Sequence, residues 1–496
     1  MRTIESSLLK EKGKFPPSIR KCVGAGRANE LLRKAALDQL EQTYQDCGFQ
    51  YLRFHGLFAE DMGVYKETTD GKPIYNFQYI DMLYDELLQI GIRPFVELSF
   101  MPDALASGTQ TVFWWKSNVT PPTDYSKWGN LIRKFAEHLV MRYGLEEVEN
   151  WYFEVWNEPN HPAFFSGTQE DYFKMYDIAA QAIKGVSPSL QVGGPATAGN
   201  AWIPELIEHC ASNQIPLDFI STHTYGVFGD FDEFGNKQLY LIKNQDCIIQ
   251  SCQKVREQIQ QSSMPDLKLH YTEWSASFSS RDPIHDTYIE AAYILYNLKR
   301  VAPFVDSMSY WTFTDIFEEA GIAETPFHGG FGLMNLESIK KPAYFAYSFL
   351  NQLGDIELEC EDTDAYICKK TNDSIQILFW SFQLPNQKEE PNGVFFKRDL
   401  PTEQEDDVRI VIKDLEPGTY LLKRYQTGYG VNDVYTEYLK RGCNLERKQD
   451  TQLLQDICNN EPLDRQYIEI GSDHCLEYIV SQRLYDCHMI TLEKVM

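Results

Sequence analysis

Long apolar runs are absent from this 496-residue sequence. No window offers the roughly 18 apolar residues of a membrane span, and residues 1–21 contain no apolar stretch of signal-peptide length. The eleven cysteines are an odd number without a CxxC pair, which argues against a disulfide framework and against a zinc site. We therefore expect a cytoplasmic protein with reduced, mostly buried thiols and no membrane partner.

Several catalytic motifs are also missing. There is no glycine-rich phosphate turn after a predicted strand, no HExxH helix and no GxSxG elbow. These absences argue against a nucleotide-binding enzyme, a zinc hydrolase and a serine esterase. We expect no cofactor and no metal.

Basic residues are few for a chain of this size. Lys and Arg total 46 against 72 Asp and Glu, which gives a net charge of −26. A polyphosphate backbone needs clustered basic side chains, so nucleic acid is a poor partner, and an anionic polysaccharide would be repelled for the same reason. Aromatic residues, in contrast, make up 14% of the chain, and aromatic rings can stack against flat ligand faces. The composition favours a small neutral substrate.

Strand and helix patterns alternate eight times between residue 20 and about residue 350. The predicted strands are Lys21–Gly24, Tyr51–His55, Pro94–Ser99, Tyr152–Asn157, Gln191–Gly194, Asp218–His223, Leu269–Thr272 and Ser307–Thr312. The intervening helical patterns include Asn29–Asp46, Tyr79–Leu88, Tyr125–Arg142, Gln169–Gly185, Gln245–Ser262 and Tyr288–Val301. Eight such units predict an α/β fold, a closed (β/α)8 or TIM barrel. A doubly wound open sheet is the alternative, but it normally has fewer units and a phosphate turn.

The character of the chain changes after a last predicted barrel helix, Ala343–Leu353. Short strand patterns separated by polar turns then predict a C-terminal β-sandwich, with a helical insertion or extension near residues 430–460. We therefore expect a catalytic barrel over residues 15–353 and an accessory domain over residues 354–496, to which residues 1–14 add a strand. A homo-oligomer is left open.

Two carboxylates end predicted barrel strands. Glu158 follows the fourth strand in Trp151–Asn160 (WYFEVWNEPN), and Glu273 ends the seventh in His270–Ser275 (HYTEWS). Active sites of such barrels lie at the carboxyl ends of the strands, so both side chains should point into one mouth. Cleavage of a glycosidic bond needs such a pair, one to protonate the leaving oxygen and one to attack the anomeric carbon or activate water. Two structural glutamates at loop entrances are the alternative.

These motifs resemble the retaining (β/α)8 glycosidases, and the wider sequence resembles glycoside hydrolase family 39, especially its β-xylosidases. The resemblance covers nearly the whole barrel. Its further segments are Tyr51–Gly56 (YLRFHG), Arg93–Pro102 (RPFVELSFMP), Ser221–Gly226 (STHTYG), Tyr310–Glu319 (YWTFTDIFEE) and Phe327–Leu333 (FHGGFGL). By position, the resemblance implies that Glu158 is the general acid/base and Glu273 the nucleophile.

The resemblance also implies sugar-binding residues. Asn157 matches the residue that holds the 2-hydroxyl, while Arg53 and His55 orient the nucleophile and bind a hydroxyl. Tyr225 matches a donor to the nucleophile, and His223 one that binds a ring hydroxyl. The alternatives are structural: a turn cap for Asn157, a buried and merely satisfied histidine for His223, and partners at strand ends for Arg53 and His55.

Four more residues match the outer part of a sugar site. Glu318 and Glu319 match an acidic pair that grips the outer hydroxyls of the non-reducing sugar, although a solvated pair in a loop is the ordinary interpretation. Trp311 matches the platform beneath the ring. Phe113 would close the side where a hexose carries its hydroxymethyl group, and Trp114 is the alternative for that role.

We expect a retaining exo-acting β-xylosidase that releases xylose from the non-reducing ends of short, neutral xylooligosaccharides. The alternatives are another activity of the same family, on α-L-arabinopyranosides, galactosides, glucosides or α-L-iduronides, and a non-catalytic sugar-binding barrel. The C-terminal sandwich as a carbohydrate-binding module is a further alternative.

Overall fold

The computed structural model of the chain describes residues 1–232, 235–371, 374–445 and 447–495. Eight parallel strands close into a barrel, in the order β10-β11-β12-β15-β16-β3-β4-β7. Their bounds are β3 (Cys22–Arg27), β4 (Tyr51–His55), β7 (Arg93–Leu98), β10 (Tyr152–Val155), β11 (Gln191–Thr197), β12 (Phe219–Tyr225), β15 (Lys268–Ser275) and β16 (Ser307–Tyr310). Each predicted strand overlaps one of these, and the predicted TIM barrel is confirmed.

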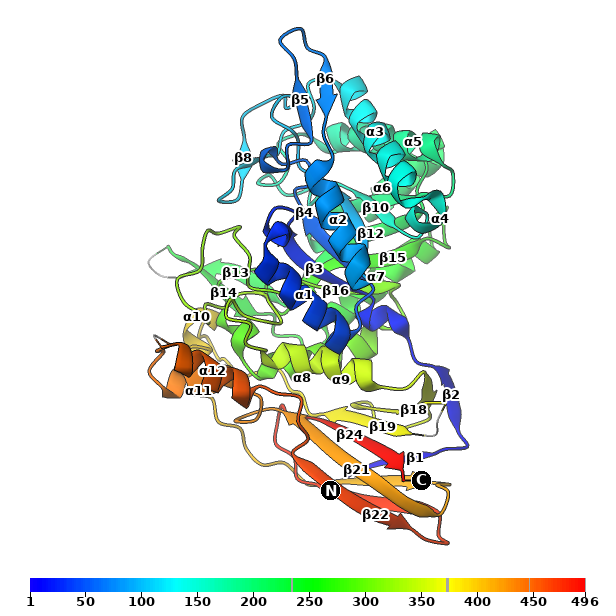
Figure 1. Ribbon diagram of the computed structural model, residues 1–496, viewed down its shortest axis with the longest axis vertical. Coiled ribbons are helices and arrows are strands. Elements are labelled where there is room, and N and C mark those ends of the chain that lie inside the picture. Colours follow the sequence, from blue (N-terminus) through cyan, green and yellow to red (C-terminus); the bar gives the residue numbers. More distant parts are fainter. Residues whose placement is uncertain (233–234, 372–373, 446, 496) are drawn as a thin grey trace.

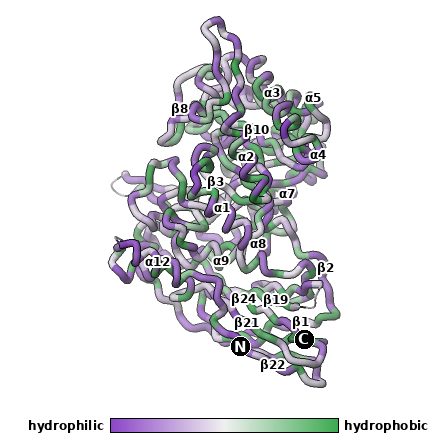
Figure 2. Tube along the Cα trace, in the orientation of Figure 1, coloured by the Kyte–Doolittle hydropathy of each residue, from purple (hydrophilic) through white to green (hydrophobic). Residues whose placement is uncertain are grey.

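Helices surround the barrel in the upper part of Figure 1. They are α1 (Lys34–Cys47), α2 (Gln78–Ile90), α3 (Tyr125–Tyr143), the short α4 (Leu145–Val148), α5 (Gln169–Val186), α6 (Ile203–Asn213), α7 (Cys247–Gln260), α8 (Ile289–Val301) and α9 (Pro342–Gln352). Hydrophobic and hydrophilic residues alternate along them (Figure 2), and the buried face of α3 contains Trp128, Leu131, Ile132, Phe135, Ala136 and Leu139. That spacing is one face of an α-helix, which packs on the barrel.

Helix boundaries follow local sequence signals. The side chain of Asp124 accepts hydrogen bonds from the first turn of α3, and Thr168 and Asp171 form a capping box at the start of α5. Gly48 and Gly91 end α1 and α2 in the left-handed conformation, which glycine adopts without steric cost. No helix within the described residues combines the length and the apolarity needed to cross a bilayer.

Three small hairpins extend the loops at the barrel mouth. They are β5 (Tyr65–Glu67) with β6 (Pro73–Tyr75), β8 (Thr111–Val112) with β9 (Ser117–Asn118), and β13 (Val227–Phe231) with β14 (Lys237–Leu241).

Two further sheets lie below the barrel in Figure 1, and both chain ends lie there. A seven-stranded sheet has the order β2-β17-β18-β19-β24-β21-β22, and a three-stranded sheet has the order β1-β20-β23. The bounds are β1 (Arg2–Ser7), β2 (Glu11–Lys14), β17 (Ile356–Leu358), β18 (Ala365–Lys369), β19 (Ile375–Trp380), β20 (Val408–Lys413), β21 (Gly418–Thr427), β22 (Asp464–Ile470), β23 (Cys475–Val480) and β24 (Cys487–Lys494), with short helices α10 (Asn392–Phe395), α11 (Val434–Lys440) and α12 (Lys448–Ile457). Residues 1–14 therefore contribute two strands, one to each sheet.

The two sheets share one apolar core. Ile4 of β1 and Ile410 of β20 belong to the same buried cluster as Ile377 of β19 and Leu422 of β21. This is the sandwich arrangement, in which inward side chains of two sheets pack together.

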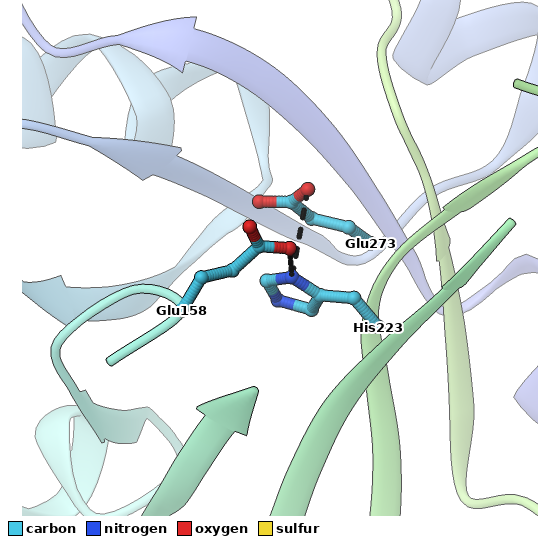
Figure 3. Close-up of side chains that lie close together, drawn as sticks. All are labelled: Glu158, His223 and Glu273. Atoms are coloured by element: carbon cyan, nitrogen blue, oxygen red, sulfur yellow. Dashed lines mark hydrogen bonds and ion pairs between the residues drawn. The ribbon is translucent and has the colours of Figure 1, made fainter. Parts of the chain in front are cut away.

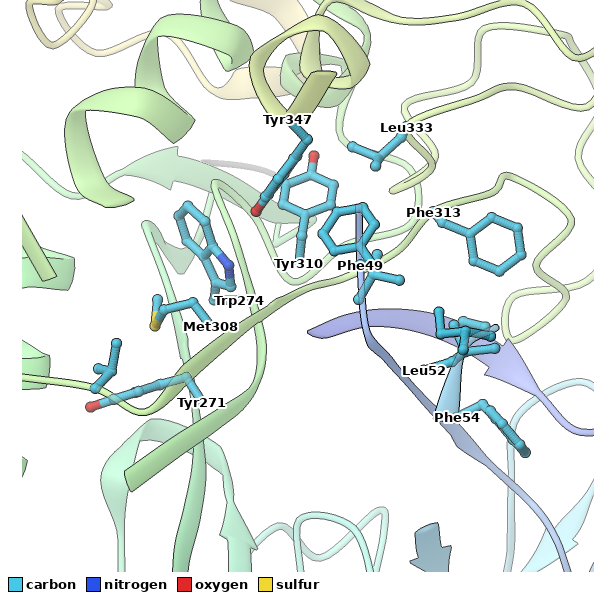
Figure 4. Packing of buried hydrophobic residues seen from close by; sticks show 14 of the residues in the cluster. Phe49, Leu52, Phe54, Tyr271, Trp274, Met308, Tyr310, Phe313, Leu333 and Tyr347 are labelled. Atoms are coloured by element: carbon cyan, nitrogen blue, oxygen red, sulfur yellow. The ribbon is translucent and has the colours of Figure 1, made fainter. Parts of the chain in front are cut away.

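The sandwich packs against α8 and α9 of the barrel. Phe382 contacts the rings of Tyr293 and Tyr296 on α8, and Arg300 at the end of that helix pairs with Asp364 at 2.8 Å. The large aromatic core of the barrel continues on the other side of the helices, where Tyr310 of β16 contacts Tyr347 of α9 (Figure 4). This shared core couples the barrel to the sandwich.

Candidate active site

The mouth of the barrel holds a cavity of about 460 Å³. Eight residues that the sequence predicts for the site line this cavity: His55, Phe113, Asn157, Glu158, Tyr225, Glu273, Trp311 and Glu319. They come from the ends of different strands and from the loops that follow them, as expected for the carboxyl face of such a barrel.

Layers of inward-pointing side chains form the floor of the cavity. Tyr51, Phe95, Tyr152 and Phe219 fill the amino end of the barrel with aromatic rings. Alternation along β4 then brings Arg53 and His55 inward above Tyr51, because side chains of one strand face the same side at every second residue. The polar layer that contains Arg53 and His55 therefore lies on a layer of buried aromatic rings.

Strand β15 departs from this alternation. Its pairing with β12 shifts between Thr222 and His223: Thr222 is opposite Tyr271, whereas His223 is opposite Glu273, so Thr272 is an inserted residue. Such a bulge re-aims side chains. As a result both Thr272 and Glu273 reach groups inside the barrel, Glu154 and Arg53 respectively.

Glu273 lies among donors to both carboxylate oxygens. Arg53 Nη1 donates to Oε1 at 2.5 Å and the Tyr225 hydroxyl donates to Oε2 at 2.7 Å. Burial by itself raises the pKa of Glu273, but the charges of His223, Arg53 and His55 and the bond from Tyr225 outweigh it and hold the pKa at about 2. Glu273 is therefore ionised at neutral pH.

Glu158 faces Glu273 across the cavity (Figure 3). One carboxylate oxygen of each residue and a ring nitrogen of His223 lie within 4.8 Å of one another. His223 Nδ1 is 2.8 Å from Glu158 Oε1 and 3.6 Å from Glu273 Oε2. The backbone of Glu158 has a φ of 45°, an uncommon value outside glycine, and its N–H donates to the Ala196 carbonyl at 2.8 Å. The separation suits direct attack on a sugar held between two carboxyl groups.

Arg53 links three buried carboxylates. Besides Glu273, its guanidinium contacts Glu154 through Nε at 2.9 Å and Glu97 through Nη2 at 2.6 Å. Nη2 also donates to Asn157 Oδ1 at 2.8 Å. Because the amide oxygen of Asn157 is occupied, its NH₂ group is the part left to face the cavity.

His55 and Glu319 lie next to each other in the wall of the cavity. His55 Nδ1 donates to Glu97 Oε2 at 2.8 Å, and Nε2 lies 3.4 Å from Glu319 Oε1. Burial lowers the pKa of His55, but the charge of Glu97 and the contact with Glu319 outweigh it and raise the pKa to about 10. Burial is also the main reason that the pKa of Glu319 rises to about 7, and the charges of Glu273 and Glu158 add to it against the opposing effect of His55.

Three predicted residues lie behind the cavity wall. Arg53 and His223 are fully buried and touch the two glutamates instead of lining the cavity. Glu318 points away: its carboxylate accepts two hydrogen bonds from Arg33, at 2.6 and 2.9 Å, and these bonds lower its pKa. Of the two aromatic candidates for the side wall, Phe113 lines the cavity whereas Trp114 is 56% exposed outside it.

Sequence reasoning missed several residues of the site. The lining also includes His161, Phe164, Asn200, Thr224, Lys237, Phe278 and Phe331. All four of Phe331, Glu97, Thr272 and Glu154 lie within motifs that carry the family resemblance, so position within a motif is the signal that could have identified them. Lys237 and Phe278 carry no such signal, because the β13–β14 hairpin and the loop after β15 bring them to the cavity.

Glu158, His223 and Glu273 are also the one group of His, Cys, Asp or Glu side chains, within the described residues, that is placed to hold a metal ion. Their oxygens and nitrogens already face donors or acceptors of the protein. In this group the two carboxylates are held by hydrogen bonds to other side chains, Glu273 by Arg53 and Tyr225 and Glu158 by His223.

Comparison with known proteins agrees with this geometry. The model of the glycosyl hydrolases family 39 matches residues 3–390. A β-xylosidase of Geobacillus stearothermophilus is 44% identical over 411 residues, 79% of this chain and 81% of that protein, and one of Caldicellulosiruptor saccharolyticus is 47% identical over 360 residues, 71% and 72% of the respective chains. The crystal structure of a monomeric β-xylosidase from Caulobacter crescentus CB15 superimposes with a TM-score of 0.97 at 39% identity and covers 100% of both chains. With a family model matched over most of its length and relatives at these identities, the chain belongs to glycosyl hydrolase family 39.

Proposed function

We propose that the protein is a retaining exo-β-xylosidase that releases xylose from the non-reducing ends of xylooligosaccharides. The observation that carries the proposal is the facing pair Glu158 and Glu273, with Glu273 held ionised by Arg53 and Tyr225. The curated relatives named as β-xylosidases, at 44% and 47% identity, support the choice of sugar.

In the first step Glu273 acts as nucleophile. Its carboxylate attacks the anomeric carbon while Glu158 gives a proton to the glycosidic oxygen, so the bond to the leaving sugar breaks and an ester between xylose and Glu273 forms. Ester formation removes the negative charge of Glu273, which lies near Glu158 in the free enzyme. Glu158, which has given up its proton, is left as the carboxylate that can accept a proton from water.

In the second step Glu158 acts as base. It takes a proton from water, whose oxygen attacks the anomeric carbon and breaks the ester to Glu273. Two displacements at one carbon leave its configuration retained, and both glutamates return to their starting protonation states.

The remaining wall residues fit a pyranose in the cavity. Trp311 lies under the ring position, and the free NH₂ of Asn157 is placed to donate to a hydroxyl next to the anomeric carbon. Glu319 Oε1 is buried and accepts no hydrogen bond within the described residues, so it is free to accept one from a sugar hydroxyl, next to the His55 ring. Phe113 stacks on His55 and narrows the side where a hexose carries its extra carbon. Glu318 acts indirectly in this proposal: its ion pair with Arg33 holds the loop that also carries Glu319.

We also propose a division of labour along the chain. Residues 15–353 form the catalytic barrel, and residues 354–496 with residues 1–14 form an accessory sandwich whose role is structural, because Phe382 and Asp364 anchor it to α8. All eleven cysteines are free thiols, which supports a reducing cytoplasm and substrates that have already been imported.

Hydrolysis of nitrophenyl glycosides tests the proposed function. Release of nitrophenol is measured from the β-D-xyloside, α-L-arabinopyranoside, β-D-glucoside, β-D-galactoside and α-L-iduronide, with wild type, Glu158→Gln and Glu273→Gln. Glu205→Gln, on the exposed face of α6, is the matched control. We expect a preference for the xyloside, loss of at least about 10⁴-fold in Glu273→Gln, and a slowed second step in Glu158→Gln.

Other outcomes separate the alternatives. Preference for another glycoside would keep the mechanism and replace the sugar. A folded wild type that binds xylose and turns over none of the five substrates would identify a sugar-binding barrel and overturn the proposal.

A further inference from the structure

A chain of buried hydrogen bonds runs behind the cavity from Glu154 to Glu158. The Thr272 hydroxyl donates to Glu154 Oε1 at 2.7 Å, and Thr272 Oγ1 is 3.2 Å from His223 Nε2. The other ring nitrogen, Nδ1, is 2.8 Å from Glu158 Oε1. Glu154, Thr272 and His223 are fully buried, so water has no access to replace a member of the chain.

The direction of these hydrogen bonds follows from the chemistry of each group. Glu154 receives the Arg53 Nε–H at 2.9 Å, and a carboxylate paired with a guanidinium only accepts. Thr272 has a single hydroxyl hydrogen, and it points to Glu154. The oxygen of Thr272 therefore presents a lone pair to His223, and Nε2 must carry the hydrogen in that contact.

This tautomer determines whether a proton lies between His223 and Glu158. With its hydrogen on Nε2, His223 is either a neutral imidazole with a lone pair on Nδ1 or, while it also holds the shared proton, the imidazolium whose charge acts on Glu273. Two lone pairs at 2.8 Å repel, so one proton has to lie between His223 Nδ1 and Glu158 Oε1, on either atom.

We propose that Thr272 is a positioning residue that, through Glu154 and His223, keeps this shared proton at Glu158 for delivery to the leaving sugar. The inference rests on the proposed function of Glu158 as general acid. Loss of the proton at high pH is opposed as long as Thr272 donates to Glu154, because the imidazole then has no hydrogen to offer Glu158. Thr272 does not touch the cavity and acts only through its neighbours.

The bulge in β15 supports a dedicated role for Thr272. In an unbroken strand, Thr272 and Glu273 would face opposite sides, and only one would reach the interior. The inserted position gives the barrel both side chains from consecutive residues, one serving Glu158 through His223 and one serving as the nucleophile.

Other charged groups around His223 do not interrupt the chain. Glu273 Oε2 is 3.6 Å from Nδ1, and Tyr225 on the same strand directs its hydroxyl to Glu273. On the opposite side of Glu273, Arg53 and His55 project from β4 and Glu319 from the loop after β16. Among the described residues, Nδ1 of His223 is approached by the carboxylates of Glu158 and Glu273, and Nε2 has the Thr272 hydroxyl within hydrogen-bond distance.

The experiment compares two substrates in Thr272→Val. Cleavage of xylobiose needs a proton on the leaving oxygen, whereas a dinitrophenolate leaves without one. We expect the alkaline limb of the kcat/KM profile for xylobiose to move down by about one pH unit, since a neutral His223 with its hydrogen on Nδ1 becomes available once the hydroxyl is gone. The profile for dinitrophenyl β-xyloside should stay as in wild type.

Two threonine variants serve as controls. Thr272→Ser keeps the hydroxyl and should keep the wild-type limb. Thr222→Val removes a fully buried hydroxyl from the neighbouring strand. That hydroxyl donates to the Thr197 carbonyl and takes no part in the hydrogen bonds between Glu154 and Glu158, so the alkaline limb should stay in place. An unchanged limb in Thr272→Val, or an equal shift with both substrates, would overturn the inference.

Glu158→Ala separates this inference from the proposed function. It should abolish cleavage of xylobiose and spare the first step with the dinitrophenyl substrate. If Glu158→Ala lowers the cleavage rate of both substrates equally, Glu158 is not the general acid and the proposed function is wrong. If Glu158→Ala behaves as expected and Thr272→Val does not, only the inference about Thr272 is wrong. Should Thr272→Val not fold, nitrogen NMR of the histidine-labelled wild type decides, because a bare Nε2 on His223 contradicts the proposal.

Discussion

Arg53 Nη1 donates to Glu273 Oε1 at 2.5 Å, although 220 positions separate the two residues in the chain. The contact places a permanent cation against a buried carboxylate, which burial alone would drive towards its neutral form. Because Arg53 also pairs with Glu97 and Glu154, one guanidinium stabilises the charge of three buried carboxylates.

Arg53→Lys should destabilise the protein despite the retained charge. An ammonium group cannot reproduce the planar fork that reaches three buried carboxylates, so at least one of them is left without a donor. We expect a loss of about 3–5 kcal/mol in the free energy of unfolding, measured with urea. Arg133→Lys, on the partly exposed face of α3, is the control and should change stability by less than about 0.5 kcal/mol. Equal stability of the two variants would contradict the role of Arg53.

Tyr225→Phe should shift the acidic limb of activity upward. The reactive form of Glu273 is the carboxylate, and the hydroxyl of Tyr225 is one of the groups that depress its pKa to about 2. Without that donor the pKa rises, so activity is lost at a higher pH as the solution is acidified. We expect a shift of about one pH unit in kcat/KM. Tyr79→Phe, with an exposed ring on α2, should not move the acidic limb. An acidic limb that stays in place in Tyr225→Phe would show that the charges of His223, Arg53 and His55 hold Glu273 ionised without the Tyr225 hydroxyl.

Gly24→Ala should disturb the platform beneath the sugar. A Cβ atom at Gly24 would meet the indole ring of Trp311, which has no room to move because it is 2% exposed. Overpacking of this kind costs about 1–3 kcal/mol, and displacement of Trp311 should raise KM for xylosides. Gly185→Ala is the control, since that position in α5 is open and should be neutral or slightly stabilising. Unchanged KM and stability in Gly24→Ala would refute the packing argument.

Native-state alkylation should modify one cysteine far faster than the others. Cys443 is the one exposed thiol, and burial protects most of the remaining ten. Burial also raises the pKa of several, including Cys22 to about 12, which keeps them as unreactive thiols. Mass spectrometry after brief iodoacetamide treatment should find a single rapid adduct, lost in Cys443→Ser, and eleven adducts after denaturation. Fewer than eleven would reveal disulfides.

Much of the site could be predicted because its signals are local. Alternation of strand and helix patterns predicts the barrel, and the rule that the carboxyl ends of barrel strands converge predicts that Glu158 and Glu273 lie together. The strands of the C-terminal sandwich are harder to predict from the sequence. Strand β24 was not predicted, although it lies in the middle of the seven-stranded sheet, because pairing with β19 and β21 determines it rather than the pattern of its own residues.

Electrostatic partners were beyond sequence reasoning. Glu318 and Glu319 are adjacent and of the same type, yet their side chains lie apart. Arg33 holds the Glu318 carboxylate away from the cavity, whereas the Glu319 carboxylate lies in the cavity wall beside His55. His223 lies near the end of β12, but its ring lies behind Glu158 instead of lining the cavity.

The amino-acid sequence alone specifies the barrel and the two motifs that contain Glu158 and Glu273, since periodicity and motif position are properties of the chain itself. Tertiary structure decides which groups touch. The insertion of Thr272 in β15 exists only relative to the register of β12, and the shared proton at Glu158 depends on an arginine from β4 and a glutamate from β10. Hydrogen bonds extend over about 3 Å, so the protonation state of the site is determined only once distant segments have packed together.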